Sequence, residues 1–159
     1  MLQFVKQVER ALRRDIGYES YLFHRLTQGI RCPDCWSKEL KQAKSASCES
    51  CLGVGYKDGY SDGVMMYIHF PPESPDVLVV SHIKFKISTG MAFGTNYPLI
   101  SPEDVIIRNI DKEVFKVGTP VRRTGRRLHV ARQIFPVRAI ERNTIEYNLI
   151  DRIAETRVA

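Results

Sequence analysis

Two pairs of cysteines, each with the spacing Cys-x-x-Cys, constrain this chain more than any other feature of its sequence. Cys32 and Cys35 form the first pair, and Cys48 and Cys51 form the second; no other cysteine occurs among the 159 residues. Each pair places two thiolates on one side of a metal ion, and two pairs complete the tetrahedron that Zn²⁺ prefers. The spacing therefore predicts a four-cysteine zinc site. Four thiolates leave no open coordination position, so the predicted role of the metal is structural.

Other roles for four cysteines are two disulfides, buried free thiols or redox catalysis. Disulfides belong mainly to secreted proteins, and the first residues of the chain turn charged at Lys6 without the apolar run of a signal peptide. We therefore expect a soluble protein made in a reducing cytoplasm. Neither pair has the strand-then-helix setting of a thioredoxin-type site, and the His-x-Glu motif of zinc deaminases is missing.

The residues before the cysteines predict one helix and an extended lead-in. Apolar residues recur at helical spacing over residues 2–15, and Gly17 interrupts the pattern. Residues 18–31 are aromatic and mixed, and we expect an extended segment that leads into the metal site. His24 lies there and is interpreted as a packed or surface histidine, because four cysteines already saturate the metal.

From Val64 onward the apolar residues repeat every second position, which indicates β-strands. The predicted strands cover residues 64–70, 77–80, 83–87, 104–108, 113–117 and 133–140, with turns at glycine and proline positions between them. Residues 121–132 are interpreted as a basic turn flanked by strands. The end of the chain reads as a last strand or short helix and then an extension. The predicted fold class is α+β, mainly β: a small antiparallel β-barrel preceded by an N-terminal helix and a four-cysteine zinc knuckle.

The predicted organisation has four parts. Residues 1–31 hold the helix and lead-in segment, 32–63 the zinc-knuckle insertion, 64–150 the barrel, and 151–159 a C-terminal extension. Within the barrel region, residues 88–102 show no clear period and are expected to form a loop. Its apolar side chains, Met91, Phe93 and Tyr97 among them, lie either over their own barrel or against a neighbouring subunit; we favour subunit contact.

Basic residues concentrate late in the chain. The net charge is +6, with an isoelectric point near 9.3, which favours an acidic partner. Arginine forks bind phosphates and carboxylates, so this patch is expected to contact either DNA or an acidic protein, the alternative being a solvated loop. The candidate contact residues are Arg122, Arg123, Arg126, Arg127 and Arg132.

No catalytic pattern stands out in the sequence. It holds no Ser-His-Asp setting and no glycine-rich phosphate loop before a helix. Glu103 and Asp104 are adjacent at a strand start and are interpreted as turn residues. We expect a protein that is not an enzyme, has no small-molecule substrate and does not associate with a membrane, since no stretch of 18 apolar residues occurs.

The order of parts resembles that of zinc-containing virion proteins of tailed bacteriophages. The resemblance rests on the N-terminal helix, the Cys-Pro-x-Cys and Cys-x-x-Cys-x-Gly-x-Gly units of Cys32 to Gly55, and the Pro-x-Asp-Val-Ile hairpin of Pro102 to Val117. The arginine stretch that ends at Ile134 extends it. The C-terminal half is similar to the small barrel of head-closure, or stopper, proteins. The cysteine and glycine unit also resembles the repeat of DnaJ-type chaperones, but only the second pair carries the glycines.

The resemblance implies a structural virion protein of the phage neck. Such a protein would connect the head, through the portal or adaptor, to the tail as part of a ring around the DNA channel. Its partners would be other neck, portal and tail proteins and copies of itself, with DNA in the channel as a further contact. It would be made in the host cytoplasm and reside in the virion. The alternative is a cytoplasmic zinc-ribbon protein that binds nucleic acid.

Overall fold

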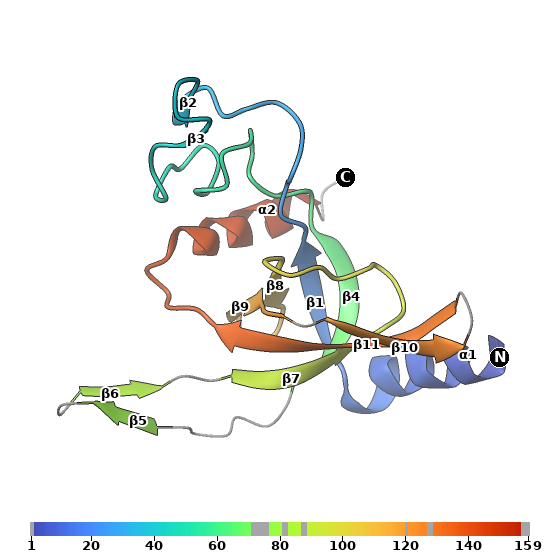
Figure 1. The fold of residues 1–159 in the computed structure, drawn as a ribbon. Helices are drawn as coiled ribbons and strands as arrows, with labels where there is room; N and C mark the ends of the chain where they lie inside the picture. Colours follow the sequence, from blue (N-terminus) through green and yellow to red (C-terminus); the bar gives the residue numbers. More distant parts are fainter. Residues whose placement is uncertain are drawn as a thin grey trace.

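The centre of the molecule is a closed antiparallel β-barrel of six strands, seen in a computed structural model that describes residues 2–70, 77–80, 83–86, 89–119, 121–126 and 129–156 (Figure 1). Around the barrel the order is β11-β7-β4-β1-β8-β9, and β9 pairs again with β11. The strands are β1 (Tyr18–Phe23), β4 (Val64–His69), β7 (Thr89–Gly94), β8 (Val105–Arg108), β9 (Val114–Val117) and β11 (His129–Ala139).

One long strand, β11, closes the barrel. Residues 133–138 pair with β7, and residues 137–139 pair on the other side with β9. The first part of β11 extends past the barrel and pairs with β10 (Arg122–Arg126). A closed sheet leaves no unpaired edge among the six strands, which removes the usual site of edge-to-edge aggregation. The predicted fold class, a mainly β chain built on a small antiparallel barrel, is confirmed.

Side chains alternate between the interior and the exterior of the barrel, as the pleat requires. Inward-facing residues from all six strands contribute to a buried interior cluster. On β4 the inward residues are Met66 and Ile68, whereas the outward Met65 is exposed. The interior cluster consists of Leu22, Met66, Ile68, Phe70, Ala92, Ile100, Ile106, Phe115, Val117, Phe135 and Val137.

A second apolar cluster lies outside the barrel, on β1, β8 and β9. Val105 and Ile107 of β8 are fully buried there beneath Leu149 and Ile153 of helix α2 (Leu149–Thr156), which follows a 3₁₀ turn (Ile145–Asn148). Because β8 is buried on both faces, its sequence is apolar without alternation. The expectation of a C-terminal extension over 151–159 is therefore wrong for residues 151–156, which belong to a packed helix; residues 157–159 lie outside the described residues.

The N-terminal helix is confirmed as α1 (Leu2–Ala11), which continues into a π-helical turn (Leu12–Ile16). Leu12 is buried, and Gly17 ends the helix by donating its N–H to the Leu12 carbonyl at 2.9 Å. A Cβ at Gly17 would lie 2.2 Å from that carbonyl oxygen, so a larger residue would break the turn. Among the described residues, no helix is long and apolar enough to cross a membrane.

Two sequence expectations about the strands need correction. Residues 18–23 are a barrel strand paired with both β4 and β8, so the barrel does not begin at residue 64. Residues 89–94 are strand β7 and not part of a loop; β7 pairs with β4 and β11. Its inward position is the small Ala92 between exposed Met91 and half-buried Phe93, so the strand lacks the large inward residues that make alternation visible.

Strands β5 (Val77–Val80) and β6 (Ile83–Lys86) form a separate two-stranded hairpin. The sequence predicts both strands but places them in the barrel, whereas in the structure they pair with each other and stand away from it (Figure 1). Alternation identifies a strand but carries no information about its partner.

A buried glutamine fixes the segment between β7 and β8. The Gln133 side chain is fully buried, donates Nε2 to the carbonyls of Thr95 (2.9 Å) and Pro98 (2.7 Å), and accepts from the Ile100 N–H at 2.9 Å. Arg123 adds a hydrogen bond to the Ile100 carbonyl at 2.9 Å. These bonds hold residues 95–100 against their own barrel and place Ile100 in the interior cluster.

Arg108 closes one end of the barrel interior. Its guanidinium carbon lies 5.2 Å from the ring centre of Phe70 and 5.1 Å from that of Phe115. The same group donates to Asp111 at 3.0 Å and pairs with Glu113. Partial burial is the largest single influence on the pKa of Asp111 and opposes ionisation. The hydrogen bonds from Arg108 and from the Glu113 N–H, together with the charge of Arg108, outweigh it and lower the pKa of that carboxyl.

Replacing Gln133 with leucine is expected to destabilise the protein strongly. Leucine keeps the volume but leaves two carbonyls and one N–H without their partners, at about 1–3 kcal/mol for each buried group. We expect a loss of at least about 3 kcal/mol in urea unfolding. Gln42→Leu, at an exposed position, is the control and should change stability by less than about 0.5 kcal/mol. Equal effects of the two substitutions would contradict a stabilising role for the hydrogen bonds of Gln133.

Candidate metal centre

The cysteines lie in a module, residues 24–63, inserted between neighbouring strands β1 and β4 (Figure 1, top). Two antiparallel legs connect it to the barrel. The Leu26 N–H donates to the Gly59 carbonyl at 3.0 Å and the Cys32 N–H to the Gly55 carbonyl at 3.1 Å. At its far end a small hairpin joins β2 (Trp36–Ser37) to β3 (Gln42–Ala43). The pairing of β1 with β4 thus fixes the base of the module.

The four thiols converge on one point. All four Sγ atoms lie within 4.8 Å of one another. The Sγ atoms of Cys32 and Cys48 are 3.8 Å apart, and those of Cys35 and Cys51 are 3.3 Å apart. Both distances are too long for a disulfide bond. A tetrahedron with Zn–S distances of about 2.3 Å has sulfur–sulfur edges of about 3.8 Å. The structure thus brings the predicted ligands together as a cluster that could hold a metal ion such as zinc.

Glycines with positive φ make the tight turns around the sulfurs. Gly53 has φ +74°, and a Cβ there would lie 2.3 Å from the Ala46 carbonyl oxygen. Gly59 has φ +67°, and its Cβ would lie 2.1 Å from the Cys51 carbonyl oxygen. Each position therefore excludes a side chain for reasons of both conformation and space. The Gly55 N–H, freed by these turns, donates to Cys51 Sγ at 3.3 Å.

The thiols influence one another's ionisation. Burial, followed by hydrogen bonds among the thiols, raises the pKa of Cys35, and burial also raises that of Cys51. Burial opposes ionisation of Cys48 as well, but hydrogen bonds from Cys35 and Cys51 outweigh it and lower the pKa of Cys48. A protein that holds four thiolates this close needs a cation between them, so binding of a metal would release protons.

A buried carboxylate anchors the module to the barrel. Asp104 accepts from the Arg25 N–H at 3.0 Å and the Ser101 N–H at 2.8 Å, and contacts His24 Nδ1 at 2.9 Å. Arg152 of α2 donates to the Asp58 carbonyl at 2.9 Å on the other leg. Asp104 is thus a turn residue, as expected, but its link to His24 spans 80 residues and has no local sequence signal.

The predicted arginine patch is divided between the two faces of the β10–β11 hairpin. Arg123 pairs with Gln133, and Arg122 with Ile134, so consecutive arginines point to opposite faces. Arg132 pairs with Thr124 and therefore shares the face of Arg122, where its guanidinium lies 6.0 Å above the Phe93 ring. Arg126 is the last residue of β10, and Arg127 lies outside the described residues.

The predicted subunit-contact residues lie on the outer surface of the barrel. Met91 is 41% exposed and Tyr97 is 74% exposed. Phe93 is half-buried and packs near His69, with ring centres 5.9 Å apart. Met91 and Phe93 share the outward face of β7, and Tyr97 follows in the next segment. The structure thus leaves two of the three available for contact with another molecule, while the contact itself stays a prediction.

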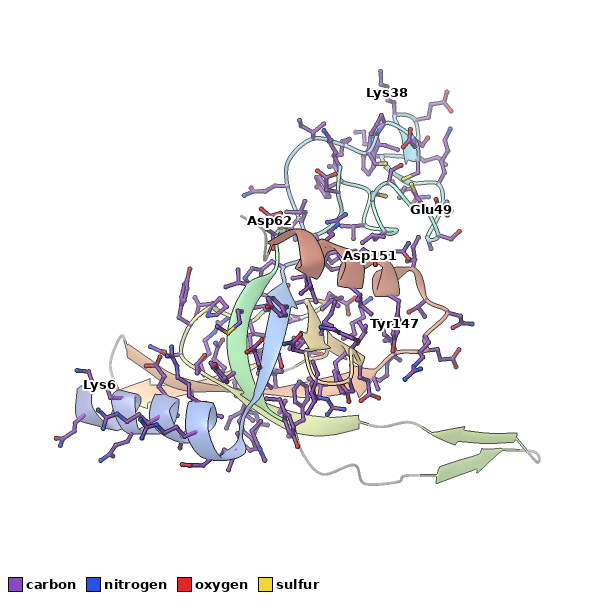
Figure 2. The ribbon with its side chains drawn as sticks, turned by 180° about the vertical axis from the view of Figure 1, so that it is seen from behind. Lys6, Lys38, Glu49, Asp62, Tyr147 and Asp151 are labelled. Atoms are coloured by element: carbon purple, nitrogen blue, oxygen red, sulfur yellow. The ribbon has the colours of Figure 1, made fainter. Side chains whose placement is uncertain are left out.

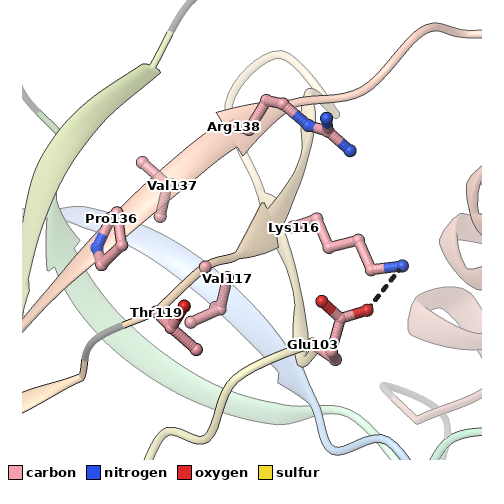
Figure 3. A pocket seen from close by; sticks show the side chains of 8 residues that line it. Glu103, Lys116, Val117, Thr119, Pro136, Val137 and Arg138 are labelled. Carbon is pink, nitrogen blue, oxygen red and sulfur yellow. Dashed lines mark ion pairs between the residues drawn. The ribbon is translucent and has the colours of Figure 1, made fainter.

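A shallow pocket of about 320 Å³ lies beside β9 and β11 (Figure 3). Lys116 bonds to Glu103 at 3.0 Å across it and lies 3.8 Å from Glu146. The basic Lys116 is therefore already paired within the protein. The lining residues are Glu103, Lys116, Val117, Gly118, Thr119, Pro136, Val137 and Arg138.

Comparisons with known proteins give no family for this chain. No protein-family model matches the sequence, and a search of curated proteins finds no significantly similar chain. The fold and the cysteine cluster are therefore the features from which a function is inferred.

Replacing Cys48 with serine is expected to release bound metal and to loosen the module. A serine hydroxyl is a poor ligand beside three thiolates, and the short legs alone bury little apolar surface. Elemental analysis should give about one metal ion per wild-type chain and less than about a tenth of that for the variant. Ser47→Ala is the control. Retention of both metal and melting temperature by Cys48→Ser would rule out a structural metal centre.

The bond between His24 and Asp104 predicts a pH dependence of stability. The hydrogen bond that the His24 ring donates to the Asp104 carboxylate raises the pKa of His24 above its ordinary 6.5, against partial desolvation. The folded state therefore binds the proton more tightly than the unfolded state. This contribution is complete below about pH 6.5 and declines as pH rises through the folded-state pKa. Asp104→Asn should abolish this decline and return the His24 pKa, followed by NMR, towards 6.5; an unchanged titration would contradict the link.

Proposed function

We propose that this protein is a structural component of a virion neck, a head-to-tail connector whose copies assemble into a ring around a DNA channel. The observation that carries the proposal is the division of the chain into a closed barrel and parts that extend from it. The metal module and the β5–β6 hairpin both project from the barrel (Figure 1). Projecting parts of this kind suit a subunit that contacts several neighbours at once, in line with the resemblance to stopper proteins.

The outer face of β7 supports self-association. Met91 and Tyr97 expose large apolar surfaces although neighbouring Ala92 and Ile100 are fully buried. Exposed apolar side chains on a rigid element are typical of protein interfaces. The hydrogen bonds from Gln133 to Thr95 and Pro98 hold the segment that carries Tyr97 in one conformation. This segment therefore loses less conformational entropy on association. Met91, Phe93 and Tyr97 are thus the proposed contact residues.

Zinc is the metal that we propose for the cysteine cluster. Four thiolates in tetrahedral arrangement are the ligand set of structural zinc sites. The metal would hold residues 32–60 in one conformation, because this segment contributes only a few residues, such as Leu52 and Tyr60, to a larger apolar cluster. Its function would be to keep the module rigid as a contact element.

The arginines of the β10–β11 hairpin are proposed to contact either DNA in the channel or an acidic neighbour. Arg122 and Arg132, which share one face, are the best-placed pair for a polyanion. The competing function is a zinc-ribbon protein that binds nucleic acid as a monomer. Such a protein would bind free duplex with an affinity that falls steeply with salt concentration.

Native mass spectrometry of the purified protein, with and without a chelator, tests the proposal. We expect one zinc per chain and a ring-sized assembly, or a monomer that forms rings when neck partners are added. Tyr97→Asp should weaken assembly at least tenfold, because it places a charge in an apolar contact. Ile110→Asp, at a position 76% exposed on the β8–β9 turn, is the matched control. A strict monomer that binds duplex DNA tightly would overturn the connector function.

A further inference from the structure

Arg31, the residue before the first cysteine, packs against two aromatic rings. Its guanidinium carbon lies 3.9 Å from the centre of the Trp36 ring and 4.2 Å from that of the Tyr56 ring. Two aromatic rings therefore lie against the guanidinium group. The edge, which carries the N–H donors, is left to make hydrogen bonds.

The backbone fixes all three members of this stack. Arg31 and Tyr56 are partners in an antiparallel bridge between the two legs. The Trp36 N–H donates to the Cys32 carbonyl at 3.1 Å. On the side of Gly55, a Cβ would lie 3.5 Å from Trp36 Cε3, so the ring also packs against the glycine backbone. The arrangement of the cysteine turns thus positions the guanidinium.

The donors of Arg31 have no acidic partner in the described part of the chain. Arg31 is exposed, and among the described residues no carboxylate lies within ion-pair distance of it. Arg108, in contrast, also stacks on rings but satisfies its donors with Asp111 and Glu113. The ring contacts therefore account for the position of the Arg31 guanidinium, whereas its N–H donors stay without an acidic partner among the described residues.

We infer that Arg31 is a recognition site for a carboxylate on a partner protein. A guanidinium that is fixed in place loses little entropy when it forms two parallel hydrogen bonds to a carboxylate. This site lies on the metal module, away from the β7 surface proposed for ring assembly. The inference therefore does not depend on the connector function, and a monomeric protein would leave it intact.

The charge of the module favours a protein carboxylate over nucleic acid. Residues 24–63 contain six basic and five acidic side chains, a net of +1, which four thiolates with a divalent cation would turn to −1. Figure 2 shows Lys38 at the far end and Glu49 on the side where α2 carries Asp151. Binding of a polyphosphate needs an excess of positive charge, which a surface of mixed charge does not supply. The single guanidinium of Arg31 is sufficient to bind one carboxylate.

The test uses the full metal-loaded chain and a blocked peptide in which alanine and glutamate alternate. Trp36 is the only tryptophan, so its fluorescence reports on the stack directly. We expect saturable changes in Trp36 emission and in the NMR signal of the Arg31 Nε–H group. The corresponding glutamine peptide should cause neither change, because an amide lacks the charge that strengthens the bonds.

Arg31→Lys keeps the charge but removes the planar fork, and should weaken peptide binding roughly tenfold. Arg142→Lys, at an exposed arginine outside the module, is the matched control and should bind as the wild type does. Metal content and melting temperature are measured on both variants. If Arg31→Lys loses its metal, the NMR titration of the wild type decides alone.

Two results would overturn the inference. One is peptide binding that leaves the Arg31 signal and Trp36 emission unchanged in the wild type. The other is a larger change in Trp36 emission and in the Arg31 Nε–H signal with a duplex DNA of equal charge than with the glutamate peptide. That result would identify phosphate as the ligand of Arg31.

Discussion

The pairing of β11 with both β7 and β9 is the constraint on which the rest of the structure depends. It closes the barrel, and closure creates an inside that the interior cluster fills. The same strand carries Gln133, whose hydrogen bonds hold the segment before β8. With that segment fixed, Asp104 lies where it can bind the backbone and histidine of the first module leg. The position of the cysteine cluster thus follows from the closure of a sheet.

The outer apolar cluster connects the barrel to the metal module. Leu52 and Tyr60 of the module pack with β8 and with Leu149 of α2, so the module and the C-terminal helix stabilise each other. Burial raises the pKa of Tyr60 to about 12, so its hydroxyl stays neutral within this cluster. A metal that orders residues 32–60 would therefore also support the packing of α2 on the barrel. This coupling explains why metal loss is expected to lower the melting temperature of the whole protein.

The proposed surfaces differ chemically, and two of them adjoin, because the Arg132 guanidinium lies 6.0 Å from the centre of the Phe93 ring. The face of β7 offers apolar side chains, the β10–β11 hairpin offers arginines, and the module offers one stacked guanidinium at Arg31. Apolar surfaces gain from burial against a similar surface, whereas arginines gain from an anion. A subunit with these chemically different surfaces has the means to contact copies of itself and other molecules at the same time. Each surface can be altered by a single substitution, because its residues lie on a different element.

The sequence by itself determined the features that depend on local spacing. Two Cys-x-x-Cys units specify a ligand set, alternation identifies strands, and helical periodicity identifies α1; the barrel class and the clustered cysteines are both confirmed. Only the tertiary structure decided which strands pair. It made residues 18–23 and 89–94 barrel strands, set β5 and β6 apart, divided the arginines between two faces, and joined His24 to Asp104. These outcomes rest on contacts between distant residues, and a period of two is the same whichever partner a strand has.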